Sequence, residues 1–160
     1  MVENMAKIES TFLVNAGLSK VWEFHNDVSA LGRIMPGTVT VVSADAPMRA
    51  GSRIQLRLGA GRLGIDWMLN VVRHEPMVRF VDKQVTGPFA SWLHVHEFAT
   101  VAGGTQVTDT VTYTLPFGAI GRAVDKLIVQ HVIRSSFGPR ARATKRLLEG
   151  GVSDQRPVSG

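Results

Sequence analysis

Apolar and polar residues alternate along much of the chain before Pro116, and a period of two is typical of half-buried β-strands. The clearest alternation lies in residues 52–58, where Ile or Leu occupies every second position and Arg or Gln lies between them. Gly103-Gly104 is expected to be the two-residue turn of a hairpin between the last two strands. The pattern predicts strands over residues 8–14, 39–43, 52–58, 63–73, 78–85, 88–101 and 105–115.

Helical spacing occurs in two parts of the chain. Residues 18–26 and 28–34 predict two short helices, the second closed by Met35-Pro36-Gly37. After Pro116 a long helix is expected as far as Leu148, with a kink or break at Gly138-Pro139, because a proline cannot donate the helical hydrogen bond. The apolar face of this helix is expected to comprise Ile120, Val124, Leu127, Ile128 and His131.

Strands in succession followed by a terminal helix predict an α+β fold. We expect a curved antiparallel sheet of about seven strands wrapped on the long C-terminal helix, with the two short helices after the first strand. A sheet closed only partly by a helix leaves a cavity between them. One domain is expected over residues 8–149, preceded by a leader (1–7) and followed by a mobile tail (150–160) containing Gly, Ser and Pro.

Composition narrows the class of protein. Hydrophobic residues make up 44% and charged residues 19% of the 160 positions, as in globular domains. The absence of cysteine excludes disulfides and thiolate chemistry. No signal-peptide pattern opens the chain and no apolar run is long enough to span a bilayer, so a cytoplasmic location is expected.

The formal net charge of +5 owes much to basic residues near the end of the predicted helix. Cations are favourable at a helix C-terminus, so we interpret them as a solvated helix face, with an anionic partner as the alternative. No nucleic-acid-binding motif accompanies them, and we expect no nucleic-acid partner. The residues are Arg134, Arg140, Arg142, Lys145 and Arg146.

Several short motifs resemble the polyketide cyclase/START-like superfamily, also called SRPBCC, with its helix-grip or Bet v 1-like fold. They are Val14-Asn15-Ala16 with Val21-Trp22, Met35-Pro36, Phe80-x-Asp82-x-Gln84, Gly87-Pro88-Phe89, Trp92-x-His94-x-His96-x-Phe98 and Asp109-x-Val111-x-Tyr113. The likeness covers about residues 8–149 and is nearest to a bacterial ligand-binding subgroup of undefined function. The resemblance implies the helix-grip fold with an unbroken final helix. The superfamily places lipid carriers, cyclases, hormone receptors and hydroxylase subunits on one scaffold, so the site must decide the function.

Asp109 is a charged residue on the otherwise apolar face of the last strand, and a buried carboxylate needs a partner. With Gly103-Gly104 as the turn, Phe98 is expected opposite Asp109 and His94 opposite Tyr113. His96 would then lie diagonally between Asp109 and Tyr113. The alternation predicts an apolar cavity with a polar stripe.

The residues expected to face the cavity are mostly apolar, as in sites that bind small molecules. From the sheet they are Trp67, Phe80, Asp82, Gln84, Trp92, His94, His96, Phe98, Asp109, Val111 and Tyr113; from the helix they are Ile120, Val124, Leu127, Ile128 and His131. The alternative interpretation of the stripe is a buried structural network, in which these polar groups form hydrogen bonds only with one another.

Three kinds of chemistry fit motifs of this sequence. The set His94, His96, Asp109 and Tyr113 is suited to general acid–base catalysis on a ketone. His94-x-His96 could bind zinc with Asp109 or His131, but simple hydrogen bonding gives the same spacing, so no metal is expected. Residues 59–64 match a dinucleotide fingerprint (G-x-G-x-x-G), yet strand alternation follows it where a helix is required, so no cofactor is expected.

The sequence therefore predicts binding or transport of a small hydrophobic molecule that is aromatic, polyketide-like or lipid-like. The alternative is a cyclase- or dehydratase-type enzyme that uses the His/Asp/Tyr set. A regulatory module that binds a protein partner is a third class, and a homodimer stays open.

Overall fold

The computed structural model describes residues 5–35, 39–59 and 63–150. The expected tail lies outside these ranges except for Gly150, as do residues 1–4 of the leader and Pro36-Gly37. Within the described ranges, no helix combines the length and apolar character needed to cross a membrane.

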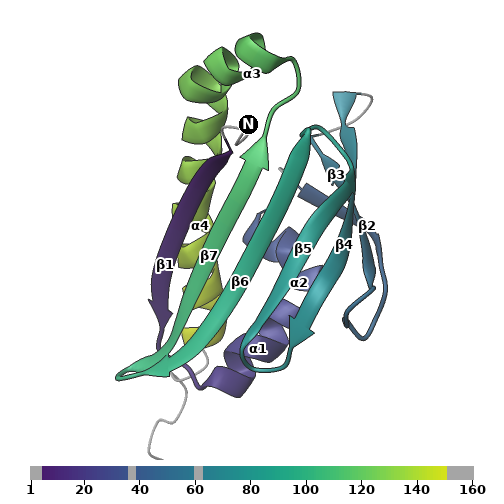
Figure 1. Ribbon diagram of the computed structural model, residues 1–160. Helices are drawn as coiled ribbons and strands as arrows, with labels where there is room; N and C mark the ends of the chain where they lie inside the picture. The colour runs from purple at the N-terminus through teal and green to yellow at the C-terminus, as the bar shows by residue number, and fades with distance from the viewer. Residues whose placement is uncertain (1–4, 36–38, 60–62, 151–160) are drawn as a thin grey trace, which may run out of the picture.

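The strands form one antiparallel sheet in the order β1-β7-β6-β5-β4-β3-β2 (Figure 1). Register shifts occur between β2 and β3 and between β4 and β5, and such bulges bend a sheet. The bounds are β1 Ala6–Val14, β2 Val39–Ala44, β3 Arg53–Leu58, β4 Ile65–Glu75, β5 Arg79–Thr86, β6 Ser91–Val101 and β7 Gly104–Thr114. The α+β helix-grip prediction is confirmed, with each strand within a few residues of its expected range.

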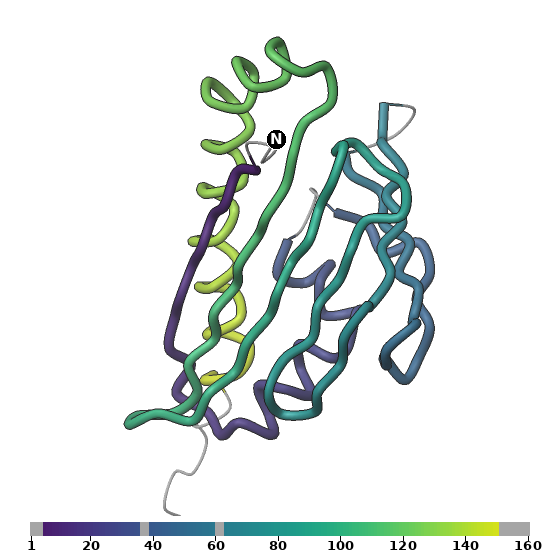
Figure 2. The backbone as a smooth tube through the Cα atoms, viewed as in Figure 1, coloured from purple at the N-terminus to yellow at the C-terminus, as the bar shows by residue number. Residues whose placement is uncertain are grey.

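The helices cover one face of the sheet (Figures 1 and 2). α4 runs along β1 and contacts α2, whereas α1 packs on β6 and β7. Trp22 of α1 lies edge-on to Phe80 and Phe98, with ring centroids 6.0 and 5.4 Å away, and so fixes α1 to the sheet. The bounds are α1 Leu18–Asn26, α2 Ser29–Ile34, α3 Gly118–Val124, the π-helical turn η2 Asp125–Val129 and α4 Gln130–Glu149.

The predicted break at Gly138-Pro139 is wrong. α4 continues through Pro139, and the irregular part of the helix is η2, further toward the N-terminus. Ser135, Gly138 and Pro139 are all exposed, so the carbonyl that loses its helical partner lies on the solvent side, where the loss costs least.

The β6–β7 register differs by two residues from the expected one. Val101 pairs with Gly104, so Ala102 and Gly103 form the turn and Gly104 is already in the strand. Gly104 has φ 138°, and a Cβ there would overlap the backbone oxygen of Val14, which only glycine avoids. A shift of two keeps every side chain on its predicted face but moves its partner, so His96 lies directly opposite Asp109.

Candidate functional site

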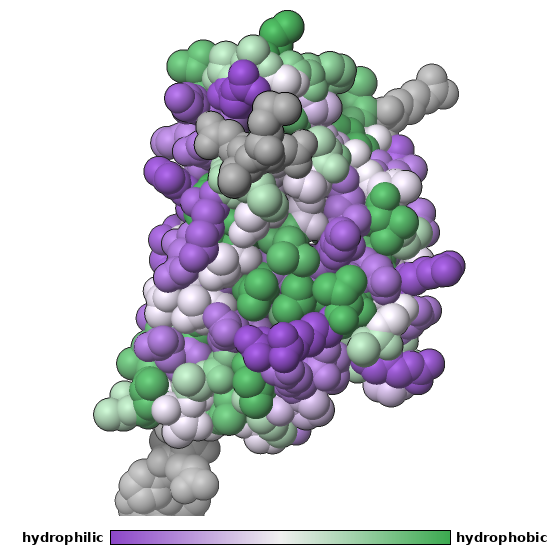
Figure 3. Space-filling view, in the orientation of Figure 1, coloured by the Kyte–Doolittle hydropathy of each residue, from purple (hydrophilic) through white to green (hydrophobic). Residues whose placement is uncertain are grey.

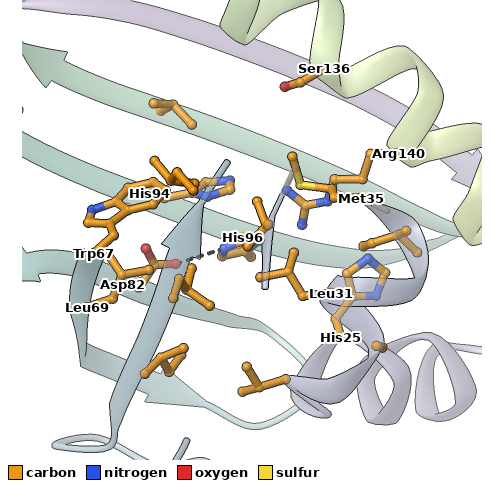
Figure 4. Close-up of a pocket in the computed structure, with 18 of the residues that line it drawn as sticks. His25, Leu31, Met35, Trp67, Leu69, Asp82, His94, His96, Ser136 and Arg140 are labelled. Atoms are coloured by element: carbon orange, nitrogen blue, oxygen red, sulfur yellow. Dashed lines mark hydrogen bonds and ion pairs between the residues drawn. The ribbon is translucent and has the colours of Figure 1, made fainter. Parts of the chain in front are cut away.

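A cavity of about 330 Å³ lies between the sheet and the helices (Figure 4). Strands β3 and β4 supply one wall through Ile54, Leu56, Trp67 and Leu69. Helices α1, α2 and α4 supply the other walls, and most of the lining side chains are apolar. The size and lining are typical of a small-molecule site.

A cluster of five buried ionisable groups lies at one side of this cavity. We call Asp82, His94, His96, Asp109 and Arg140 the polar cluster. It draws on β5, β6, β7 and α4, because alternate residues of neighbouring strands share a face and α4 crosses that face. Burying five such groups is costly unless they pair with one another.

Asp109 is fully buried and is the centre of the cluster. Its Oδ1 accepts a 2.9 Å hydrogen bond from Nε2 of His94. Nδ1 of His96 lies 2.8 Å from the same oxygen, as an ion pair without good hydrogen-bond alignment. Nε2 of His96 donates a 3.0 Å bond to Oδ2 of Asp82, so a carboxylate flanks each ring nitrogen of His96.

Both carboxyl groups are ionised. Burial raises the pKa of Asp109, but the charge of Arg140 and the contacts with His94 and His96 outweigh it and hold this pKa well below its usual value. Burial likewise raises the pKa of Asp82, and the hydrogen bond from His96 outweighs it, so the pKa is lowered.

The pKa values of the two histidines shift in opposite directions. Burial opposes protonation of His96, but the contacts with Asp109 and Asp82 prevail and raise its pKa. Burial and the neighbouring His96 lower the pKa of His94, and the bond to Asp109 offsets only part of this. Protonation is therefore favoured at His96 and disfavoured at His94, which is the neutral ring of the pair. A carboxylate can only accept, so Nε2 of His94 carries the proton and Nδ1 has a free lone pair.

His25 of α1 also lines the cavity. Burial, helped by the charge of Arg140, lowers its pKa to about 4, so this ring is neutral near neutral pH. Its Nδ1 is 2.8 Å from the backbone oxygen of Val21 and therefore carries the proton that is donated there. The ring lies against Phe98, with centroids 5.1 Å apart.

The structure places part of the predicted set in the cavity wall. This part comprises Trp67, Phe80, Asp82, Trp92, His94, His96 and Val111. Asp109 is not in the wall itself; it lies behind His94, His96 and Arg140, which line the cavity and contact its carboxylate.

Three further sheet residues face other parts of the molecule. Gln84 donates a 2.7 Å hydrogen bond to the backbone oxygen of Phe89 and so holds the turn before β6. Phe98 packs in the core under α1. The hydroxyl of Tyr113 donates to Asp125 Oδ1 at 2.5 Å, and this bond ties β7 to η2. Burial and the bond to Asp125 raise the pKa of Tyr113.

The helix residues expected in the cavity are exposed instead. Ile120 is 72% and Leu127 78% accessible, and Val124, Ile128 and His131 are exposed as well. The reason is position, since α3 and η2 extend past the end of the sheet and have nothing to cover (Figure 1). Their hydrophobic side chains gather at the top of the space-filling view (Figure 3).

The part of the helix that lines the cavity lies nearer the C-terminus than the predicted residues, and the sequence analysis did not predict it. Ile133, Ser136, Phe137 and Arg140 line the cavity. The sequence contains the pattern that predicts these residues, because the apolar residues Val129, Ile133 and Phe137 follow one another at helical intervals of four. Arg140, expected on a solvated face, is only 8% accessible. Its position seven residues after Ile133 places it on the inner face.

Two motifs have a simple structural explanation. Gly59 and Gly64 lie in the connection between the antiparallel strands β3 and β4, where no helix N-terminus follows; residues 60–62 are outside the described ranges. Ligand atoms of Asp82, His94 and His96 lie within 4.8 Å of one another, a spacing that could hold a metal ion. Both ring nitrogens of His96 already contact carboxylates, so an ion bound to His96 would have to displace one of these contacts. His131 is exposed on α4 and is not part of this group.

Comparison with known families gives a clear match. Residues 14–136 match the family model described as polyketide cyclase/dehydrase and lipid transport. No curated protein matches the chain.

Solved structures share the fold at low sequence identity. TTHA0849 from Thermus thermophilus is 18% identical, with a TM-score of 0.74 over 92% of this chain and 100% of that one. The di-domain aromatase/cyclase StfQ of the steffimycin biosynthetic pathway is 12% identical, with a TM-score of 0.73 over 91% of this chain and 51% of its own. Ara h 8.0201 is 10% identical, with a TM-score of 0.69 over 92% and 100%.

Proposed function

The chain belongs to the polyketide cyclase/dehydrase and lipid transport family, and we propose that it binds one small, largely apolar molecule in the cavity between the sheet and α4. The observation that carries this proposal is the combination of apolar walls with a single polar side. Ile54, Leu56 and Trp67 offer an apolar surface, whereas His94 and Arg140 offer polar atoms on one side. Such a lining favours an elongated or aromatic ligand with one polar end. A cytoplasmic location, expected from the sequence, belongs to the same proposal.

A neutral fluorescent probe, N-phenyl-1-naphthylamine, tests the binding function. It should bind at about one molecule per chain, and Ile133→Trp should weaken binding by about tenfold or more, because the larger ring fills cavity space. Leu127→Trp is the matched control, since Leu127 lies on the same long helix but outside the cavity. Equal binding by wild type and Ile133→Trp would place the probe elsewhere and contradict the proposal.

Acid–base catalysis is the second candidate function, and the state of His94 favours it. His94 is neutral, its Nε2 is held by Asp109, and its Nδ1 has no partner among the residues that the structure describes. A carboxylate behind a histidine is the arrangement that orients a general base. His94 Nδ1 would take the proton from the carbon next to a ketone, and the electron pair of the broken C–H bond would pass to the carbonyl oxygen, giving an enolate.

Exchange of hydrogen for deuterium on 2-tetralone in D₂O tests this chemistry. The protein should accelerate exchange at the carbon next to the carbonyl, and His94→Gln should reduce the protein-dependent rate by about 10²–10⁴-fold. NMR follows the loss of the proton signal. A His94→Gln rate equal to that of the wild-type protein would exclude His94 as the base.

A further inference from the structure

Arg140 has the largest unmet hydrogen-bonding capacity of the polar cluster in the described part of the chain, since none of its nitrogens donates a hydrogen bond there. Its side chain lines the cavity on the same side as the two histidines and is 8% accessible (Figure 4). Arginine keeps its charge in such a place, because its guanidinium does not lose a proton in proteins. Its five N–H donors therefore need acceptors inside an apolar cavity.

The protein supplies very little to these donors. Nη2 of Arg140 lies 3.6 Å from Asp109 Oδ1, which is an ion pair but too long for a hydrogen bond. That oxygen already contacts both histidines. Nε of Arg140 is buried without a partner among the described residues. By contrast, the more accessible Arg73 and Arg79 donate to Glu75 at 2.6 and 2.7 Å.

An unpaired guanidinium in an apolar cavity calls for an acceptor from the ligand. We propose that the ligand carries a carboxylate, which pairs with Arg140 through both of its oxygens. The planar fork of arginine matches a carboxylate in this way. A phosphate, with nearly two negative charges, would need a second cation that is free to pair with it. No lysine or further arginine lines the cavity in the described part of the chain, and both ring nitrogens of His96 already contact carboxylates. This inference rests on the proposed binding function and names its ligand class.

The charges of the cluster add a consequence for protons. Asp82 and Asp109 have lowered pKa values, and His96, whose pKa is raised, lies between them, with the cationic Arg140 beside Asp109. A bound carboxylate adds one negative charge. His94 faces Asp109 from β7, Asp82 from β5 and His96 on its own strand. Arg140 of α4 and the neutral His25 of α1 line the same cavity. Because only Nε2 of His94 is engaged, by Asp109, Nδ1 of His94 is the atom that would take up a proton when this negative charge is added.

A matched pair of probes tests the proposal on the intact protein. 2-Naphthoate should bind about tenfold or more tighter than 2-naphthamide, which has the same shape without the charge. Arg140→Gln should abolish this preference, while Arg142→Gln, an exposed arginine on the same helix, should retain it. Calorimetry in two buffers of different ionisation enthalpy should show uptake of about one proton with naphthoate and none with naphthamide.

The outcomes separate this inference from the function on which it rests. Naphthamide binding as tightly as naphthoate to the wild-type protein would overturn the carboxylate proposal and leave the cavity as an apolar site. This comparison needs no variant, so it holds even where Arg140→Gln does not fold. Failure of both probes and of N-phenyl-1-naphthylamine would instead overturn the binding function itself.

Discussion

Asp109→Asn is expected to lower the free energy of unfolding by about 3–5 kcal/mol, the usual cost of removing one partner from a buried charge cluster. The substitution keeps the shape of the side chain and creates no cavity. It leaves Asp82 as the one carboxylate of the polar cluster, so positive charge on Arg140 and His96 is less well compensated. Urea unfolding of the variant and the wild type measures the loss.

The control and a second observable make this expectation specific. Asp66→Asn removes an aspartate on β4 whose side chain is 64% accessible and paired with Arg57 at the surface, so its cost should be at most about 1 kcal/mol. In Asp109→Asn the pKa of His96 should also fall, because burial lowers this pKa and only Asp82 would remain as a negative charge that raises it. An unchanged His96 titration by NMR, with stability within about 1 kcal/mol of wild type, would show that Asp109 does not hold the cluster.

The sequence predicted the faces of the strands because that information is local. Side chains alternate with a period of two, so His94, His96 and Asp109 fall on one face in any register that keeps the parity. The exact register could not be predicted in this way. Gly104 lies in the strand and not in the turn, against the backbone oxygen of Val14, which leaves no room for a Cβ at Gly104. That contact joins residues about ninety positions apart, and no local pattern carries it.

The helix shows the same limit for a different reason. Its spacing predicted an apolar stripe, and a stripe exists, but the part that covers the sheet depends on where the sheet ends. Ile120 and Leu127 precede that point and Ile133 follows it. Arg140 was interpreted as solvated because arginine usually is; its burial follows from the position of α4 against the sheet.

Acid is expected to destabilise the fold through His25, whose pKa is about 4 in the folded protein against 6.5 in the unfolded chain. Between these values unfolding takes up a proton, so the free energy of unfolding falls as the pH drops from 6.5 to about 4, by about 3 kcal/mol in total. His94, with its lowered pKa, acts in the same direction. His96 acts oppositely: its raised pKa gives stability that is complete below 6.5 and is lost as the pH rises through its folded value.

His25→Phe isolates the contribution of His25 to this pH dependence. Phenylalanine can keep the ring contact with Phe98 and removes Nε2, which is buried without a partner in the described part of the chain. The variant should therefore lose less stability than the wild type between pH 6.5 and about 4, by about 3 kcal/mol, in urea unfolding at a series of pH values. His131→Gln, which removes an exposed histidine of α4, is expected to follow the wild-type curve. Parallel curves for the wild type and His25→Phe would mean that burial and the charge of Arg140 do not hold His25 neutral.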